Sequence, residues 1–248
     1  MTTVPEEVLG LKVEVVRSLR RTAALHIVGS DLQVRVPKDL GDERVAAILQ
    51  QKRPWIVSKV AELKRVPPQK TKELVSGESF PYLGRNYRLK VQDGHQVGVC
   101  LSGGYLLATI RPTEQGEQRQ QRIQQYLDSW YKSRALERLT DKTNRYAEQI
   151  GVSPSGISVR NFKSRWGSCD SRGQLLFNWN IIKAPHAIAD YVVVHELCHL
   201  VHPNHSKNFW ALVGRFVAAF QEHRDWLKIN SKRILHEQKI IADKIITK

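Results

Sequence analysis

The chain is poor in cysteine, because Cys100, Cys169 and Cys198 are the only three in 248 residues. An odd number of widely spaced cysteines, with no C-x-x-C pair, argues against a disulfide framework and against a thiolate zinc knuckle. The first eleven residues lack the basic and then apolar order of a secretory signal. No apolar run approaches the length that spans a bilayer. These absences predict a cytoplasmic protein with no membrane association.

Acidic residues are also scarce relative to basic ones, with 24 Asp and Glu against 39 Lys and Arg, which gives a formal charge of +15. Such a charge favours anionic partners, but it is spread along the chain and fits a well-solvated surface equally well. With 41% apolar residues and six tryptophans, the chain can bury a core, which excludes disordered and low-complexity classes. The charge alone therefore does not decide the function.

The hydrophobic pattern predicts an α+β fold, with a β-rich N-terminal section at residues 1–112 and a second section at residues 113–248. No internal repeat is evident in the sequence. The expected elements are strands at 13–15, 24–28 and 32–36 with a turn at 29–31, a helix over 42–63 with a break at Pro54, a linker at 65–70, strands over 80–110, a helix over 117–150, strands at 157–160 and 175–180, helices over 186–201 and 206–220, and a basic helix from Lys228.

One short pattern carries chemistry, the H-E-x-x-H run from His195 to His199 on a predicted apolar helix. The spacing puts both imidazoles one turn apart on one face, where they can bind one zinc ion with Glu196 beside them. Zinc lowers the pKa of a bound water to about 7, and Glu196 can take its proton. The alternative interpretation is that His195 and His199 are histidines packed in the core. It leaves Glu196 unexplained, because glutamate is rarely buried unpaired.

A catalytic zinc site needs a third protein ligand, and His202, His205 and Glu222 are the candidates. On an unbroken helix His202 lies about 10 Å along the axis from His195, too far for both to bind one tetrahedral ion. Pro203 ends the helix, so the chain can fold His205 back onto the metal. His205 is therefore the favoured ligand and Glu222 the alternative.

Several separated motifs resemble the YgjP-like metallopeptidase-domain family of prokaryotes, which is related to SprT-like zincins. The motifs are Arg165 to Cys169, Asn178 to Asn180, Asp190 to Leu200, Asn204 to Ser206 and Phe209-Trp210, with Arg20-Arg21 and Tyr82 to Arg85 further upstream. The resemblance covers most of residues 15–230. It implies that His195, His199 and His205 bind the metal, that Glu196 is the catalytic glutamate, and that residues 113–248 form a zincin-like section around an H-E-x-x-H helix. The lone methionine, Met1, excludes the Met-turn of metzincins.

The segment Arg165-Trp166-Gly167-Ser168, together with Asn178, is the candidate substrate-binding region. A strand beside the active-site helix can bind an extended peptide through its backbone. The alternative is a tight turn that needs Gly167 and a tryptophan packed on the core. Arg165 and Lys163 also offer positive charge to an anionic substrate.

Three functions are consistent with these residues. The first is a zinc-dependent metallopeptidase-type hydrolase, in which Glu196 is the general base. The second keeps the metal, zinc or another divalent transition metal, but releases pyrophosphate from nucleoside triphosphates of the UTP type. The third is a SprT-like protease held weakly on nucleic acid by charge, although no helix-turn-helix or zinc finger is visible. A peptide or a nucleotide is the expected substrate, and no obligate protein partner is evident.

Overall fold

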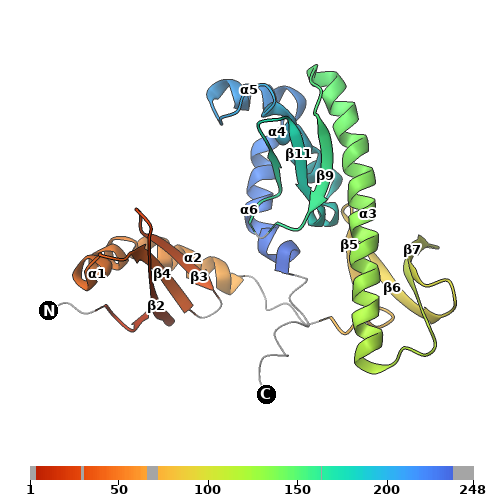
Figure 1. Cartoon of the computed structure of the whole chain (residues 1–248), viewed down its shortest axis with the longest axis horizontal. Coiled ribbons are helices and arrows are strands. Elements are labelled where there is room, and N and C mark those ends of the chain that lie inside the picture. The colour runs from red at the N-terminus through yellow and green to blue at the C-terminus, as the bar shows by residue number, and fades with distance from the viewer. Residues whose placement is uncertain (1–3, 29–30, 66–71, 163, 237–248) are drawn as a thin grey trace. The chain divides into compact units, whose positions relative to one another are not determined.

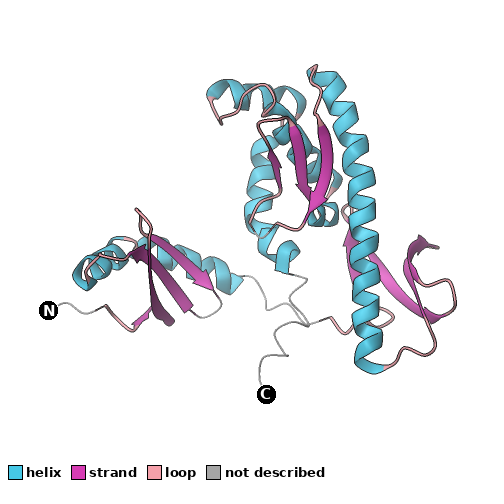
Figure 2. Cartoon of the chain, viewed as in Figure 1, coloured by secondary structure: helices cyan, strands magenta, loops and turns pink. Residues whose placement is uncertain are grey.

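The computed structural model describes residues 4–28, 31–65, 72–162 and 164–236, and Figure 2 shows their mixture of helices and sheets. This mixture confirms the predicted α+β class. The chain forms two compact units, Met1–Pro68 and Gln69–Lys248. The division therefore lies near residue 68, whereas the sequence pattern placed a boundary at residue 112. Most of the predicted linker and of the turn at 29–31, and also Lys163, lie outside the described residues.

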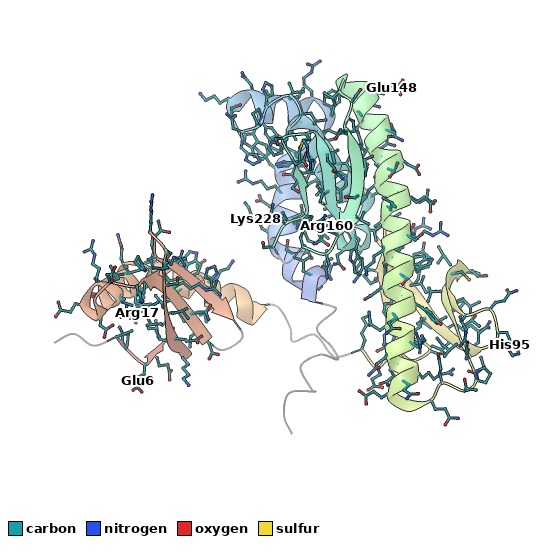
Figure 3. All side chains as sticks on the ribbon, in the orientation of Figure 1. Glu6, Arg17, His95, Glu148, Arg160 and Lys228 are labelled. Carbon is teal, nitrogen blue, oxygen red and sulfur yellow. The ribbon has the colours of Figure 1, made fainter. Side chains whose placement is uncertain are left out.

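The first unit is a four-stranded sheet with two helices (Figure 1). Its elements are β1 (Glu7–Val8), β2 (Leu11–Ser18), β3 (Ala24–Val28), β4 (Asp31–Pro37), α1 (Asp42–Gln51) and α2 (Arg53–Arg65), with the strand order β1-β2-β4-β3. Alternate residues of β4 share one core with both helices, because period-two alternation sends them to one face. Arg17 on β2 (Figure 3) forms an ion pair with Asp42, which ties the sheet to α1.

The predicted helix over residues 42–63 is two helices, and the break falls at Lys52. Pro54 is the second residue of α2, where the missing N–H of proline removes no intrahelical hydrogen bond. The interruption is therefore where the sequence placed it, within two residues.

The second unit begins with a sheet of four strands and one long helix. These are β5 (Ser79–Tyr82), β6 (Arg85–Asp93), β7 (Gly98–Ser102), β8 (Tyr105–Ile110) and α3 (Gly116–Ile150), and the strand order is β5-β6-β8-β7. Buried residues of these strands, such as Leu89 and Leu106, belong to the same core as Leu127 of α3 and Trp179 further along. This shared core is the physical reason that residues 80–110 belong with the second unit rather than the first.

The rest of the second unit carries the candidate site. It consists of β9 (Gly156–Arg160), β10 (Gly167–Cys169), β11 (Gln174–Asn178), the 3-10 helix η1 (Trp179–Lys183), α4 (His186–Cys198), α5 (Lys207–Phe216) and α6 (Phe220–His236). The sheet order is β10-β11-β9, so β10 is an edge strand, and it packs beside α4. The predicted strand at 175–180 ends at Asn178, because η1 begins at the next residue.

The two four-stranded sheets have the same topology, a structural repeat that the sequence does not show. In each sheet a hairpin joins the first two strands. The second strand pairs in parallel with the fourth strand along the chain, and the third strand pairs antiparallel with the fourth at the far edge. Both hairpins turn through Leu-Gly, with positive φ at Leu9, Gly10, Leu83 and Gly84. The repeat is hidden in the sequence because a pleated, half-buried position accepts many residue types.

Within the described residues, no helix is both long enough and apolar enough to cross a bilayer.

Candidate metal centre

Helix α4 holds His195 and Glu196 and is anchored both by the core and by α3. The residues from Val192 to Val194 are buried in the core. On its outer face Asp190 accepts hydrogen bonds from Lys142 at 2.7 Å and from Arg145 at 3.1 Å, and both donors lie on α3. Packing and ion pairs anchor the helix. The backbone positions from which its side chains project toward β10 are therefore held in place.

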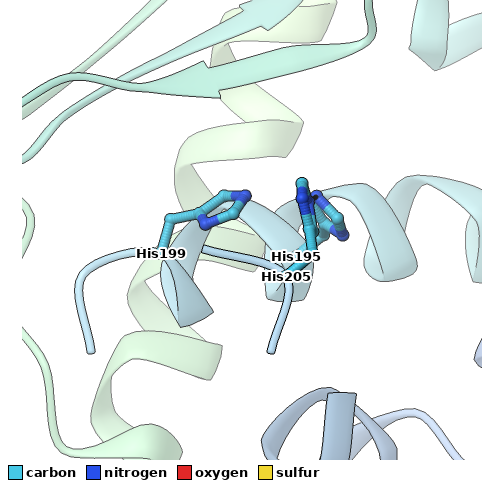
Figure 4. A group of neighbouring side chains, drawn as sticks. All are labelled: His195, His199 and His205. Atoms are coloured by element: carbon cyan, nitrogen blue, oxygen red, sulfur yellow. Dashed lines mark hydrogen bonds between the residues drawn. The ribbon is translucent and has the colours of Figure 1, made fainter. Parts of the chain in front are cut away.

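Three histidine rings meet at the C-terminal end of this helix (Figure 4). His195 and His199 come from the helix end and His205 from the turn before α5, and one ligand nitrogen of each lies within 4.8 Å of the others. The Nε2 atoms of His195 and His205 are 3.1 Å apart. Among the described residues these three form the cluster that could hold a metal, and Glu222 is exposed in the first turn of α6 and outside it.

His199 has its tautomer fixed by a main-chain group. Its Nδ1 lies 3.1 Å from the carbonyl oxygen of His202, and a carbonyl can only accept, so Nδ1 carries the proton. Nε2 is then left with its lone pair toward the other rings, which is the usual arrangement of a metal-binding histidine. His202 thus contributes through its backbone, a role that its side chain in the sequence does not reveal.

An aromatic pair on α5 surrounds the three rings. The Phe209 ring centroid lies 4.9, 4.6 and 4.9 Å from those of His195, His199 and His205. Trp210 stacks on His205 at 5.5 Å with an interplanar angle of 22°. The Ser206 hydroxyl accepts from the Phe209 backbone N–H at 3.3 Å, which makes Ser206 the N-cap and fixes where α5 begins.

Burial sets the protonation state of the imidazoles. Burial is the main cause, and together with the neighbouring His199 and His205 it lowers the pKa of His195 to about 3. Burial also lowers the pKa of His199. Because a neutral imidazole is the form that binds a metal, these rings are prepared to act as ligands near neutral pH.

Glu196 lies beside the rings with its carboxyl group pressed against β10. The residue is 6% exposed, and burial raises the pKa of its carboxyl group to about 8, while the charge of Arg165 opposes the rise. A Cβ atom added to Gly167 would lie 2.6 Å from Glu196 Oε1 and 2.7 Å from its Cγ. Only glycine at residue 167 therefore leaves room for this carboxyl group.

The Arg165–Cys169 segment is held by hydrogen bonds rather than by a tight turn alone. Trp166 Nε1 donates to Ser231 Oγ on α6 at 3.0 Å. Asn178 is fully buried, and its Nδ2 donates to the carbonyl oxygens of Phe162 at 2.9 Å and of Arg165 at 3.2 Å. This corrects the expectation that Asn178 touches a substrate, because its amide is used up in shaping the loop.

A cavity of about 740 Å³ opens over the three histidines. The histidines and Glu196 line one side of it, and Arg165 and the β10 residues Gly167 and Ser168 line the other. Trp166 lines a smaller cavity of about 220 Å³ that also reaches His195 and Glu196. The predicted residues Arg165, Trp166, Gly167 and Ser168 therefore all lie at openings to the histidine cluster.

A family model described as the YgjP-like metallopeptidase domain matches residues 21–230. No curated protein matches the chain in sequence. Two solved structures are similar, the metallopeptidase zymogens abylysin of Pyrococcus abyssi and jannalysin of Methanocaldococcus jannaschii. Each is 20% identical with a TM-score of 0.34, and each covers 38% of this chain and 93% or 96% of its own. By the extent of the family match, the chain belongs to the YgjP-like metallopeptidase domain family.

Proposed function

We propose that the chain is a zinc-dependent peptidase in which His195, His199 and His205 bind the metal and Glu196 is the general base. The observation that carries this proposal is the meeting of three imidazoles beside one buried carboxyl group in an open cavity. Membership of a metallopeptidase family supports the same reaction class.

The residues fit a bound metal ion. Two Nε2 atoms that lie 3.1 Å apart need a shared proton or a cation, because two neutral lone pairs repel one another. In a tetrahedral zinc site with bonds of about 2.0–2.1 Å, two ligand nitrogens lie about 3.3 Å apart, close to the observed spacing. A nitrogen-only set with one open position suits zinc and is also accepted by other divalent transition metals. A metal ion held by these three histidines would lower the pKa of a coordinated water to about 7 and would polarise the bond under attack.

The protein's own part in the reaction falls mainly to Glu196. Burial raises the pKa of this group to about 8, and the ionised form is the one that acts. The carboxylate accepts the proton of the attacking water and can return it to the leaving amine, as a positioned general base does. The neutral His199 ring is oriented by the His202 carbonyl and does not compete for that proton. Edge strand β10 offers the main chain of Gly167 and Ser168 to the cavity, so an extended peptide can pair with it as a further strand.

A substrate panel tests the choice between peptide and nucleotide. Purified protein supplied with zinc is expected to cleave casein or a mixed peptide library, and to release no pyrophosphate from nucleoside triphosphates. Peptide cleavage is followed by mass spectrometry and pyrophosphate by a coupled assay. Arg165, exposed at the mouth of the cavity, is the feature that favours the nucleotide alternative. Pyrophosphate release with all peptides left intact would make the peptidase assignment wrong.

Replacing Gly167 with Ala is expected to lower kcat/KM by about 10- to 100-fold without loss of metal. The new methyl group must displace the Glu196 carboxyl group, and a misplacement of about 1 Å can cost 10²-fold in rate. None of the three histidines is touched, so metal analysis should give the wild-type stoichiometry.

Gly156→Ala on β9 is the matched control. A Cβ atom there meets only Gln174, at 3.9 Å, so this variant should keep full activity. A Gly167→Ala protein as active as Gly156→Ala would show that the carboxyl group does not need its observed position.

A further inference from the structure

The Leu-Gly turn of the second unit serves as a docking point for another segment of the chain. The Leu83 N–H donates to the carbonyl oxygen of Ile182 at 2.8 Å, and the Leu83 side chain is buried. A Cβ atom on Gly84 would lie 3.2 Å from Pro185 Cα, so the glycine lets the proline pack directly on the turn. The turn thus receives two contacts from the segment 182–185: the main-chain carbonyl of Ile182, an aliphatic residue buried in the same core as Leu83, and the proline Pro185.

The first unit has the same turn without such a segment among the described residues. Leu9 and Gly10 have φ values of 56° and 80°, against 48° and 83° for Leu83 and Gly84, so the two turns have matching conformations. Both are flanked by directly paired residues, Val8 with Leu11 in one unit and Tyr82 with Arg85 in the other. Yet Leu9 is 39% exposed, and within the described residues no atom lies within 4 Å of a Cβ added to Gly10.

The exposed turn borders a groove of about 380 Å³. The hairpin lines one side of it with Val8 and Leu9, and the helices line the other with Leu49 and Arg53. Glu7 is also at the groove, so its charges are of both signs and do not select an anion such as nucleic acid or phosphate. Burial of apolar surface would therefore be the main source of affinity.

We propose that the Leu9–Gly10 turn and this groove dock a short apolar segment of another polypeptide, with the chemistry of residues 178–185. That segment would give the main-chain carbonyl of an aliphatic residue to the Leu9 N–H and pack a proline on Gly10. A folded second copy cannot supply it, because Trp179 to Lys183 are all buried in the second unit. The occupant is thus a different polypeptide, and its docking does not depend on whether the histidine cluster hydrolyses peptides.

The test is calorimetric titration of the full-length chain with the blocked peptide Asn-Trp-Asn-Ile-Ile-Lys-Ala-Pro, the sequence of residues 178–185. All proteins carry Glu196→Gln, so that the peptide survives and failure of the proposed reaction cannot influence the result. The peptide is expected to bind, and Leu9→Asn is expected to weaken it at least tenfold, because asparagine keeps the positive φ but removes the apolar side chain. A peptide with Asp in place of Ile182 should lose binding to the same extent.

Leu19→Asn is the matched control, because Leu19 is 98% exposed and does not line the groove. Absence of peptide binding, or equal binding by the Leu9→Asn and Leu19→Asn proteins, would overturn the proposal. So would a dimer in sedimentation that Leu9→Asn abolishes, since the groove would then be a self-association surface. If Leu9→Asn proves unstable, amide chemical shifts of the Leu9–Gly10 turn on peptide addition decide the question, and unmoved shifts overturn the proposal.

Discussion

The Glu196→Gln protein is expected to hydrolyse peptides about 10²- to 10⁴-fold more slowly than the wild type, with its metal content unchanged. Glutamine has nearly the same shape as glutamate and fits the same space against Gly167, but it cannot accept a proton from water. The three clustered nitrogens belong to His195, His199 and His205, so the metal should remain. The measurements are kcat/KM with the peptide found in the substrate panel and the metal-to-protein ratio after purification.

Glu222→Gln makes the same chemical change at an exposed position of α6 and is the matched control. It should keep wild-type activity and metal. Two results would contradict the assignment of Glu196 as the base: an active Glu196→Gln protein, or an inactive one that has lost its metal. The variant cannot separate a peptidase from a nucleotide hydrolase, because both reactions need the same base, and that separation rests on the substrate panel.

The local part of the site could be predicted from the sequence. An apolar run before H-E-x-x-H predicted a buried helix, and α4 begins at the predicted His186 and ends at Cys198, three residues before the predicted end. Pro203 predicted a turn that returns His205 to His195, and the two Nε2 atoms are 3.1 Å apart. These predictions depend only on helix periodicity and on the missing N–H of proline, both of which are local properties.

The main-chain contributions to the site could not be predicted in this way. The His202 carbonyl that orients His199 would be present whatever the side chain at residue 202, so no residue type marks it. Asn178 gave the opposite error, because a polar residue in a motif suggested contact with substrate, whereas its amide donates to the carbonyl oxygens of Phe162 and Arg165. A polar residue in a motif indicates that some group needs a hydrogen bond, and that group can be a backbone carbonyl as well as a ligand.

The arrangement of the two sheets was also beyond the sequence pattern. Alternation along β4 and β8 shows that each strand has one buried face, but it does not show which helix covers that face. Residues 80–110 therefore looked like a continuation of the first section, although α3 covers β8 and draws them into the second unit. The Leu-Gly pair did not reveal the repeated turn either, because Leu40-Gly41 is the same pair and leads into α1 with φ −65° at Gly41. Positive φ at Leu9 and Leu83, which leucine rarely adopts, is visible only in the structure.

Replacing His205 with Ala is expected to weaken zinc binding by more than about 100-fold. Loss of a residue that only orients a ligand typically lowers metal affinity by about 10- to 100-fold, so a larger loss identifies a ligand. The change removes the nitrogen that lies 3.1 Å from His195 Nε2 and leaves two imidazoles from one helix. Zinc at about 100 times its Kd stabilises the wild type by about 2.7 kcal/mol, and the rise in Tm that results should be absent in this variant. Competition with a chromophoric chelator gives the affinity.

Glu222→Ala should match the wild type in both measurements, because Glu222 is exposed and lies outside the histidine cluster. The two variants together decide the class of the metal site. Loss of zinc from Glu222→Ala with retention in His205→Ala would replace three imidazoles by two imidazoles and a carboxylate. That ligand set would require α6 to move its first turn toward α4, because the observed position of Glu222 does not reach the cluster. If only the Glu222→Ala protein retains zinc, His205 is the third ligand. The turn at Pro203, which returns His205 to the helix end, then completes the site.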